Sequence, residues 1–197
     1  DVREGITKFG SFDNDEHAIE IIPLCIDHFR SGMEGLIHRL MEGKFKYRGS
    51  ERTFSTRFSY RSILTATSAR ELDGETERLL KQNPDWIGDS KLNRIFLVQS
   101  PEAGYSSDDE SSPYYVIKRR LLEAGIPCQM VDSPTISNPD WKDLNLALNI
   151  TAKCGITPWV LPDRIPDATF FIGLSYTEAR DGTRIMGFAN VFNNYGR

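Results

Sequence analysis

The sequence predicts an α/β protein in which helices cover a parallel sheet, followed by an antiparallel hairpin that begins a second domain. Three observations lead to this fold class. Apolar runs alternate with helical stretches between residues 94 and 161, as in sheets whose parallel strands are joined by helices. Two further apolar runs flank Asp181-Gly182, a dipeptide typical of hairpin turns. The content of 39% hydrophobic and 26% charged residues is typical of a globular protein.

The patterns before residue 94 are looser. Residues 18–25 predict a strand, and residues 27–41 predict a helix because their apolar side chains recur at helical spacing. Residues 44–60 are polar, basic and aromatic and indicate no single element. Residues 70–82 predict a second helix, which Asn83-Pro84 ends.

The elements are better defined from residue 94 onward. The continuous apolar run 94–99 predicts a buried strand. Ser112 and Pro113 supply an N-cap and a first-turn proline for a helix that ends near residue 124. Residues 127–131 predict the next strand.

A further helix is predicted over residues 138–155, followed by a short strand over residues 159–161. We expect Leu144, Leu148 and Ala152 on the buried side of this helix because they share one face. The order strand, helix, strand, helix, strand indicates a Rossmann-like α/β sandwich.

The last part of the chain predicts two strands, over residues 170–176 and 183–192. Two strands are too few for a stable domain of their own. We therefore expect the chain to stop inside a second domain. Its first residue is Asp1, with neither an initiator Met nor a signal-peptide pattern, so we interpret the chain as part of a longer protein.

Composition excludes several classes of protein. The net charge of −4 provides no overall basic field for nucleic acid, so any such binding requires a local pocket. The three cysteines and three histidines lack the spacing of a zinc site or a disulfide framework, and reduced thiols in a cytosol are expected. No apolar run approaches the roughly 18 residues of a membrane span, so we expect no membrane partner.

Four side chains form a candidate phosphate pocket. Tyr114 and Lys118 are four residues apart on the first turns of one predicted helix, so they share a face. The N-terminus of that helix suits an anion because its N–H groups are unpaired and its dipole is positive there. Gln129 lies in the following strand and Lys153 on the last turn of the next helix, and in a sandwich all four can reach one cleft.

Each of these residues also has a purely structural explanation. Tyr114 can pack half-buried, Gln129 can be a polar strand residue, and Lys118 and Lys153 can be solvated surface charges. Spacing alone does not decide between these roles and a shared pocket.

The stretches 113–120, 126–131 and 144–155 resemble the middle (MID) domain of Argonaute proteins. The signature of that family is Tyr, Lys, Gln and Lys in this order, and Tyr114, Lys118, Gln129 and Lys153 match it. The resemblance implies that Lys118, Gln129 and Lys153 hold the 5′-phosphate of a guide strand, while Tyr114 stacks on its first base. Asn149 stands where eukaryotic relatives carry a further lysine, which implies less charge on the phosphate.

Residues 167–176 and 187–192 resemble the first hairpin of the PIWI domain, which has an RNase H-like fold. Members that cleave have a metal-binding aspartate two residues after the glycine that corresponds to Gly173, where this chain has Ser175. Two-metal catalysis requires carboxylates, so we expect no target cleavage. Ser175 also lacks the elbow motif and the nearby histidine of a serine nucleophile, whereas Glu178 could restore a metal ligand.

The resemblance implies a domain division. Residues 1–14 are expected to be a linker or domain edge, residues 15–160 the MID domain, and residues 161–197 the incomplete start of the PIWI domain. The implied function is anchoring a small guide, RNA in preference to DNA, for recognition of complementary DNA in defence against invading DNA. No catalytic cofactor is expected, although Mg²⁺ can accompany the guide 5′-phosphate.

Inactive PIWI domains of this kind are typical of short and long-B prokaryotic Argonautes, which are cytoplasmic. The implied partners are guide, target DNA, the rest of the Argonaute, and an effector such as a nuclease, a sirtuin-like or a TIR-like protein. Two alternatives remain open. One is an active guide-directed nuclease whose catalytic residues lie outside this chain. The other is an unrelated α/β enzyme that binds a nucleotide phosphate, although residues 100–104 lack a GxGxxG or Walker pattern.

Overall fold

A computed structural model describes residues 2–13, 15–88, 93–100, 111–160, 167, 169–178 and 183–193. The chain divides into two compact units, Asp1–Pro158 and Trp159–Arg197. Within the described residues, no helix is both long enough and apolar enough to cross a membrane.

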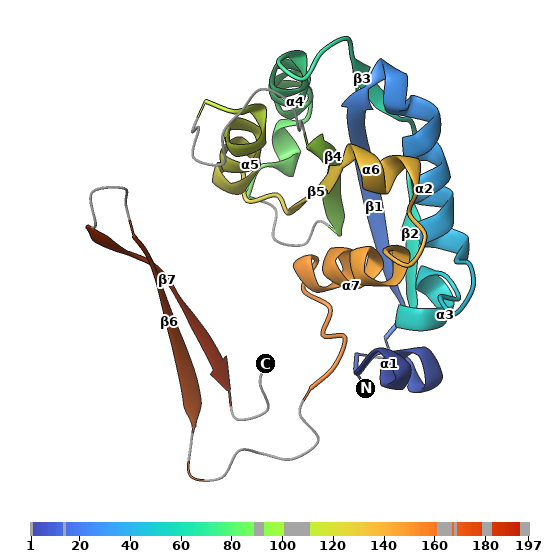
Figure 1. The fold of residues 1–197 in the computed structure, drawn as a ribbon, viewed down its shortest axis with the longest axis vertical. Helices are drawn as coiled ribbons and strands as arrows, with labels where there is room; N and C mark the ends of the chain where they lie inside the picture. Colours follow the sequence, from blue (N-terminus) through green and yellow to red (C-terminus); the bar gives the residue numbers. More distant parts are fainter. Residues whose placement is uncertain are drawn as a thin grey trace. The chain divides into compact units, whose positions relative to one another are not determined.

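The first unit is built on a parallel sheet with the strand order β2-β1-β4-β5 (Figure 1). Strand β1 is central. On one side it pairs with β4, and on the other side its first half pairs with β2 and its second half with β3. The strands are β1 (His17–Ile26), β2 (Thr56–Ser59), β3 (Leu64–Ala66), β4 (Arg94–Ser100) and β5 (Cys128–Asp132).

Helices cover both faces of this sheet, as a Rossmann-like sandwich requires. One face is covered by α1 (Val2–Phe9), α2 (Arg30–Glu42), α3 (Ser50–Phe54), α6 (Ser133–Ser137) and α7 (Asp143–Lys153). The other face is covered by α4 (Glu71–Gln82) and α5 (Pro113–Glu123). Two short 3-10 helices, η1 (Asp27–Phe29) and η2 (Pro84–Trp86), complete the unit.

The alternation of side chains along β4 shows how the two cores are separated. Ile95 and Leu97 are fully buried in the core beneath α2 and α7. Phe96 and Val98 are fully buried in the core beneath α4 and α5. A strand that is apolar at every position is expected when both faces of a parallel sheet are covered.

The N-terminal half contributes more to this sheet than its sequence pattern indicates. The predicted strand over residues 18–25 is confirmed as the central strand β1, and the stretch 44–60 contains α3 and β2. The predicted strand over residues 159–161 is wrong for Trp159 and Val160, which are not in a strand, while residue 161 lies outside the described residues. The parallel sheet is therefore completed by β1 and β2.

The expected linker or domain edge over residues 1–14 contains α1, whose Ile6 is buried in the core beneath α2.

The helix predicted over residues 138–155 is shorter in the structure, where α7 spans Asp143–Lys153 and a separate short helix, α6, ends at Ser137. Its buried face also differs from the prediction, because Leu144 and Leu148 are only half-buried and Ala152 is exposed. The buried stripe consists of Asp143, Leu146, Ala147, Ile150 and Thr151. This rotation turns Asn145, Asn149 and Lys153 away from the core.

The second unit is a two-stranded antiparallel sheet of β6 (Phe170–Glu178) and β7 (Arg184–Asn193). The predicted hairpin strands are confirmed, while the predicted turn at residues 180–182 lies outside the described residues. The pairing shifts register between Ser175 and Tyr176. Large apolar side chains of this unit are exposed within the chain, namely Phe170, Ile172, Leu174, Val191 and Phe192.

Candidate phosphate-binding site

All four predicted pocket residues line one cavity of about 490 Å³ in the first unit. Tyr114 and Lys118 reach it from α5, Gln129 from β5, and Lys153 from α7. The cavity also borders Ser100 and Asp132, the last residues of two neighbouring parallel strands. Ligands of open α/β sheets bind at this carboxyl edge of the strands.

The start of α5 fixes Tyr114 and Lys118. Ser112 caps this helix, since its hydroxyl accepts a 3.5 Å hydrogen bond from the backbone N–H of Tyr115, and Pro113 occupies the first turn. One turn later, Lys118 Nζ donates a 3.1 Å hydrogen bond to Tyr114 Oη and lies 5.1 Å from the centre of the Tyr114 ring. That hydrogen bond raises the pKa of Lys118, so its ammonium is fully charged at neutral pH.

Gln129 and Lys153 form a second pair on the other wall of the cavity. Lys153 Nζ donates to Gln129 Oε1 at 2.9 Å and to the backbone carbonyl of Cys128 at 2.8 Å. The amide nitrogen of Gln129 donates to the carbonyl of Met130 at 2.8 Å, which fixes the oxygen of this amide toward Lys153. The exposed lysine on the last turn of α7 is thereby held beside β5.

Cys128 lines the same cavity as both pairs. Burial raises its pKa, while the charges of Lys153 and Lys118 both act to lower it. Both lysines and the Cys128 thiol belong to residues that line the one cavity. The structure therefore brings the four sequence-predicted residues together.

Sequence reasoning missed two charged residues of this cavity. Lys142 Nζ donates to Thr135 Oγ1 at 2.9 Å, and Asp132 accepts a 2.9 Å hydrogen bond from the Thr135 backbone as the N-cap of α6. Asp132 followed by a proline two residues later is a cap signal visible in the sequence, whereas nothing local indicates the position of Lys142.

The lining carries a local excess of positive charge. Three lysines, at positions 118, 142 and 153, face one carboxylate, Asp132, in a chain whose net charge is −4. The hydrogen bond from Thr135 lowers the pKa of Asp132, so this carboxylate is ionised and partnered. The charged groups of the cavity are therefore mainly N–H donors, which suits a phosphate.

Among the described residues, no group of three His, Cys, Asp or Glu side chains is arranged to hold a metal ion. Ser175 belongs to the second unit, where its backbone pairs with Phe188 between β6 and β7. Its side chain lies outside what the structure describes.

Comparison with known proteins finds one similar sequence and one similar fold among Argonaute proteins. Over 116 residues, the sequence is 31% identical to the protein argonaute of Aquifex aeolicus (strain VF5). The matched region covers 56% of this chain and 16% of that protein. The fold is similar to that of the Argonaute protein from Methanocaldcoccus janaschii, with a TM-score of 0.59 and 15% identity over 96% of this chain and 26% of that one. No protein-family model matches the chain. The chain thus spans less than a third of the length of each of these two proteins.

Proposed function

We propose, from the premise that the chain is a segment of an Argonaute protein, that its first unit anchors the 5′-phosphate of a guide strand. The observation that carries this proposal is the convergence of Lys118, Gln129 and Lys153 beside Tyr114 in one cavity. Lys118, Gln129 and Lys153 bind the phosphate oxygens in this proposal. Tyr114 stacks on the first base.

The chemistry of the cavity favours a terminal phosphate over an internal one. A terminal phosphate carries up to two negative charges at pH 7, whereas an internal phosphodiester carries one. Each hydrogen bond to a charged group contributes about 1.5–3 kcal/mol, so a dianion gains most from two ammonium groups. A Mg²⁺ ion that accompanies the phosphate is part of the proposal, and among the residues that line the cavity Asp132, Asn145 and Asn149 have side-chain oxygens of the kind that Mg²⁺ binds.

The second unit is proposed to be the first hairpin of a PIWI domain that does not cleave its target. This part of the proposal rests on Ser175, because a serine hydroxyl does not replace a carboxylate at a two-metal centre. The domain boundary then lies near residue 160. The apolar side chains exposed on β6 and β7 support a hairpin that belongs to a larger sheet.

The cellular role is proposed from the family. The guide is RNA in preference to DNA, the target is complementary DNA, and a separate effector protein acts after recognition. The protein is proposed to be a cytoplasmic part of prokaryotic defence against invading DNA.

Affinity for guides with a 5′-phosphate or a 5′-hydroxyl tests the anchoring role. Lys118→Ala should weaken binding of the phosphorylated guide by about 1.5–3 kcal/mol and leave the hydroxylated guide nearly unchanged. Lys81→Ala removes the same charge from α4, outside the cavity, and should affect neither guide. Equal losses for both guides in the Lys118 variant would remove Lys118 from the phosphate site.

A further inference from the structure

A second cavity, of about 620 Å³, lies along α7 in the same unit. Asn145 lines both this cavity and the phosphate-binding cavity, so α7 contributes to a wall of each. The remaining lining comes from α1, from the segment 44–48 that follows α2, and from Trp141, which precedes α7. None of the four pocket residues predicted from the sequence contributes to it.

Two large aromatic side chains are exposed at this cavity. The rings of Phe45 and Trp141 are stacked, with their centres 4.9 Å apart and their planes 7° from parallel. Phe45 is 57% exposed and Trp141 is 68% exposed, so burial does not explain either residue. Both also have a positive φ, of 57° and 67°, which is unfavourable for bulky side chains. Such backbone strain is concentrated at functional sites.

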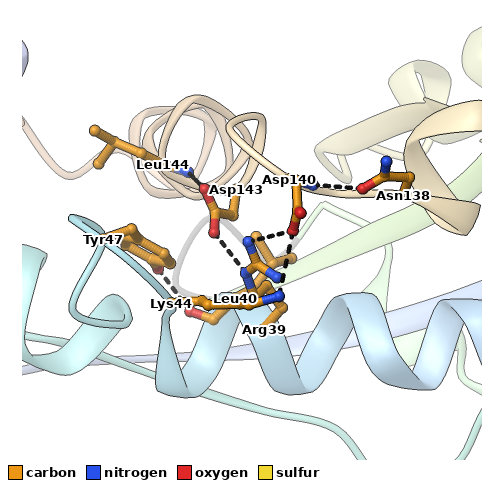
Figure 2. Close-up of polar contacts among 8 residues, drawn as sticks. All are labelled: Arg39, Leu40, Lys44, Tyr47, Asn138, Asp140, Asp143 and Leu144. Carbon is orange, nitrogen blue, oxygen red and sulfur yellow. Dashed lines mark hydrogen bonds and ion pairs between the residues drawn. The ribbon is translucent and has the colours of Figure 1, made fainter.

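Ion pairs and hydrogen bonds formed by neighbouring residues hold the segments that carry Phe45 and Trp141 in place (Figure 2). Arg39 lies 2.8 Å from Asp140 and donates to Asp143, which ties the end of α2 to the start of α7. Lys44 lies 3.6 Å from the same Asp140 carboxylate. The buried Tyr47 donates from its hydroxyl to the Leu40 carbonyl at 2.6 Å, which closes the segment back onto α2. The aromatic stack is therefore preorganised.

The cavity is also basic. Its lining includes Lys8, Lys44, Lys46 and Arg48 against the acids Glu4 and Asp143. Asp143 is already neutralised by Arg39. Lys46 and Arg48 are exposed, and within the described part of the chain neither forms an ion pair or hydrogen bond. Exposed cations beside an exposed aromatic stack are complementary to a ligand that has both negative charge and a flat ring.

We propose that this second cavity binds single-stranded nucleic acid, with a base stacked on the Phe45–Trp141 pair and flanking phosphates at Lys46 and Arg48. Aromatic faces accept any base, and cations along the path of the backbone supply affinity that depends on salt. An apolar or aromatic peptide would use the rings but leave the cations without a partner. The site is independent of the 5′ end and does not require the proposed function of the first cavity.

The test uses the full chain and a fluorescein-labelled 12-nucleotide single strand with a 5′-hydroxyl, so that the first cavity contributes no terminal phosphate. Trp141→Ala should weaken binding by about 5- to 150-fold, the range expected for loss of one stacked base. Lys46→Ala should reduce the slope of log affinity against log salt by about 0.7, as expected for one lost phosphate contact on a single strand. Lys81→Ala should change neither quantity.

Intrinsic fluorescence keeps the test valid if Trp141→Ala misfolds. The chain has three tryptophans. Binding of the single-stranded nucleic acid should quench the tryptophan fluorescence of the unaltered chain but not that of the Trp141→Phe variant. The proposal is overturned if Lys46→Ala and Trp141→Phe behave as the unaltered chain does. It is also overturned if adenosine or uridine monophosphate binds as tightly as the strand, or if an aromatic peptide displaces the strand.

The two sites are distinguished by the 5′ end of the strand. Lys118→Ala should reduce the preference for a 5′-phosphate and leave the effect of Trp141→Ala intact. Trp141→Ala should weaken binding of both strands and preserve the preference for a 5′-phosphate. The result for Lys118→Ala therefore tests the proposed phosphate site, and the result for Trp141→Ala tests the second cavity separately.

Discussion

The guanidinium of Arg39 donates a 2.7 Å hydrogen bond to Asp143, which joins the end of α2 to the start of α7. Only 10% of the Arg39 side chain and 6% of the Asp143 side chain are exposed. Burial alone would lower the pKa of Arg39, but the hydrogen bonds with Asp143 and Asp140 raise it. This ion pair fixes the helix that carries Lys153 at its other end and borders both cavities.

Arg39→Ala is expected to destabilise the fold by about 3–5 kcal/mol, because it leaves the Asp143 carboxylate buried without its cation. Urea unfolding followed by far-UV circular dichroism measures this change. Arg78→Ala removes an exposed pair with Glu75 on α4 and serves as the matched control, with little loss expected. Similar losses in the two variants would mean that the Arg39–Asp143 pair adds no more than a surface pair does.

Tyr114→Ala is expected to weaken guide binding by about 1–3 kcal/mol through loss of base stacking. Tyr114→Phe keeps the ring but removes the hydroxyl that accepts from Lys118, and it should retain most of the affinity. Titration of a labelled 5′-phosphorylated guide compares the variants. Unchanged affinity in the alanine variant would rule out a stacking role.

Stability should fall as the pH rises above 9. Burial raises the pKa of Cys25 to about 11 and that of Cys154 to about 12, from an ordinary value of 9.0. The unfolded chain therefore loses these protons first. The contribution of the neutral thiols to stability is complete below pH 9 and is lost between pH 9 and about 11 for Cys25 and between pH 9 and about 12 for Cys154. Each thiol contributes a slope of at most about 1.4 kcal/mol per pH unit.

Urea unfolding at pH 8, 9 and 10 measures this slope. The slope should be smaller in Cys25→Ala and Cys154→Ala variants, whatever their stability at pH 8. If the free energy of unfolding falls just as steeply with pH in both variants, the effect belongs to other titratable groups.

Ser175 predicts that the complete protein binds a target without cutting it. Guide, complementary target and Mg²⁺ or Mn²⁺ should yield a complex on a native gel and intact target on a denaturing gel. A cleavage product that appears only with the matching guide would contradict the proposed inactivity. It would favour the alternative of an active nuclease with carboxylates outside this chain.

Local signals predicted much of the first site. The Ser112-Pro113 start of α5 and the spacing of four residues between Tyr114 and Lys118 depend only on helix geometry, so the sequence was sufficient for them. The position of Lys142 depends on Thr135 in a separate helix, and no periodic pattern contains that contact.

Long-range pairing explains the other differences between expectation and structure. The central position of β1 is set by its parallel neighbours β2 and β4, whose residues are about 40 and 75 positions away. Phe45 and Trp141 are likewise almost 100 residues apart in sequence and meet only because α2 packs beside α7. Propensity and periodicity act over one or two turns, so they do not report such contacts.

The shared wall formed by α7 has a thermodynamic consequence. If a ligand in one cavity turns or shifts this helix, the other cavity changes shape with it, since Asn145 faces both. Linkage then requires the effect to be reciprocal: occupancy of the first cavity alters affinity in the second by the same factor as the reverse. Eleven residues of helix would thus couple two binding equilibria within one small domain.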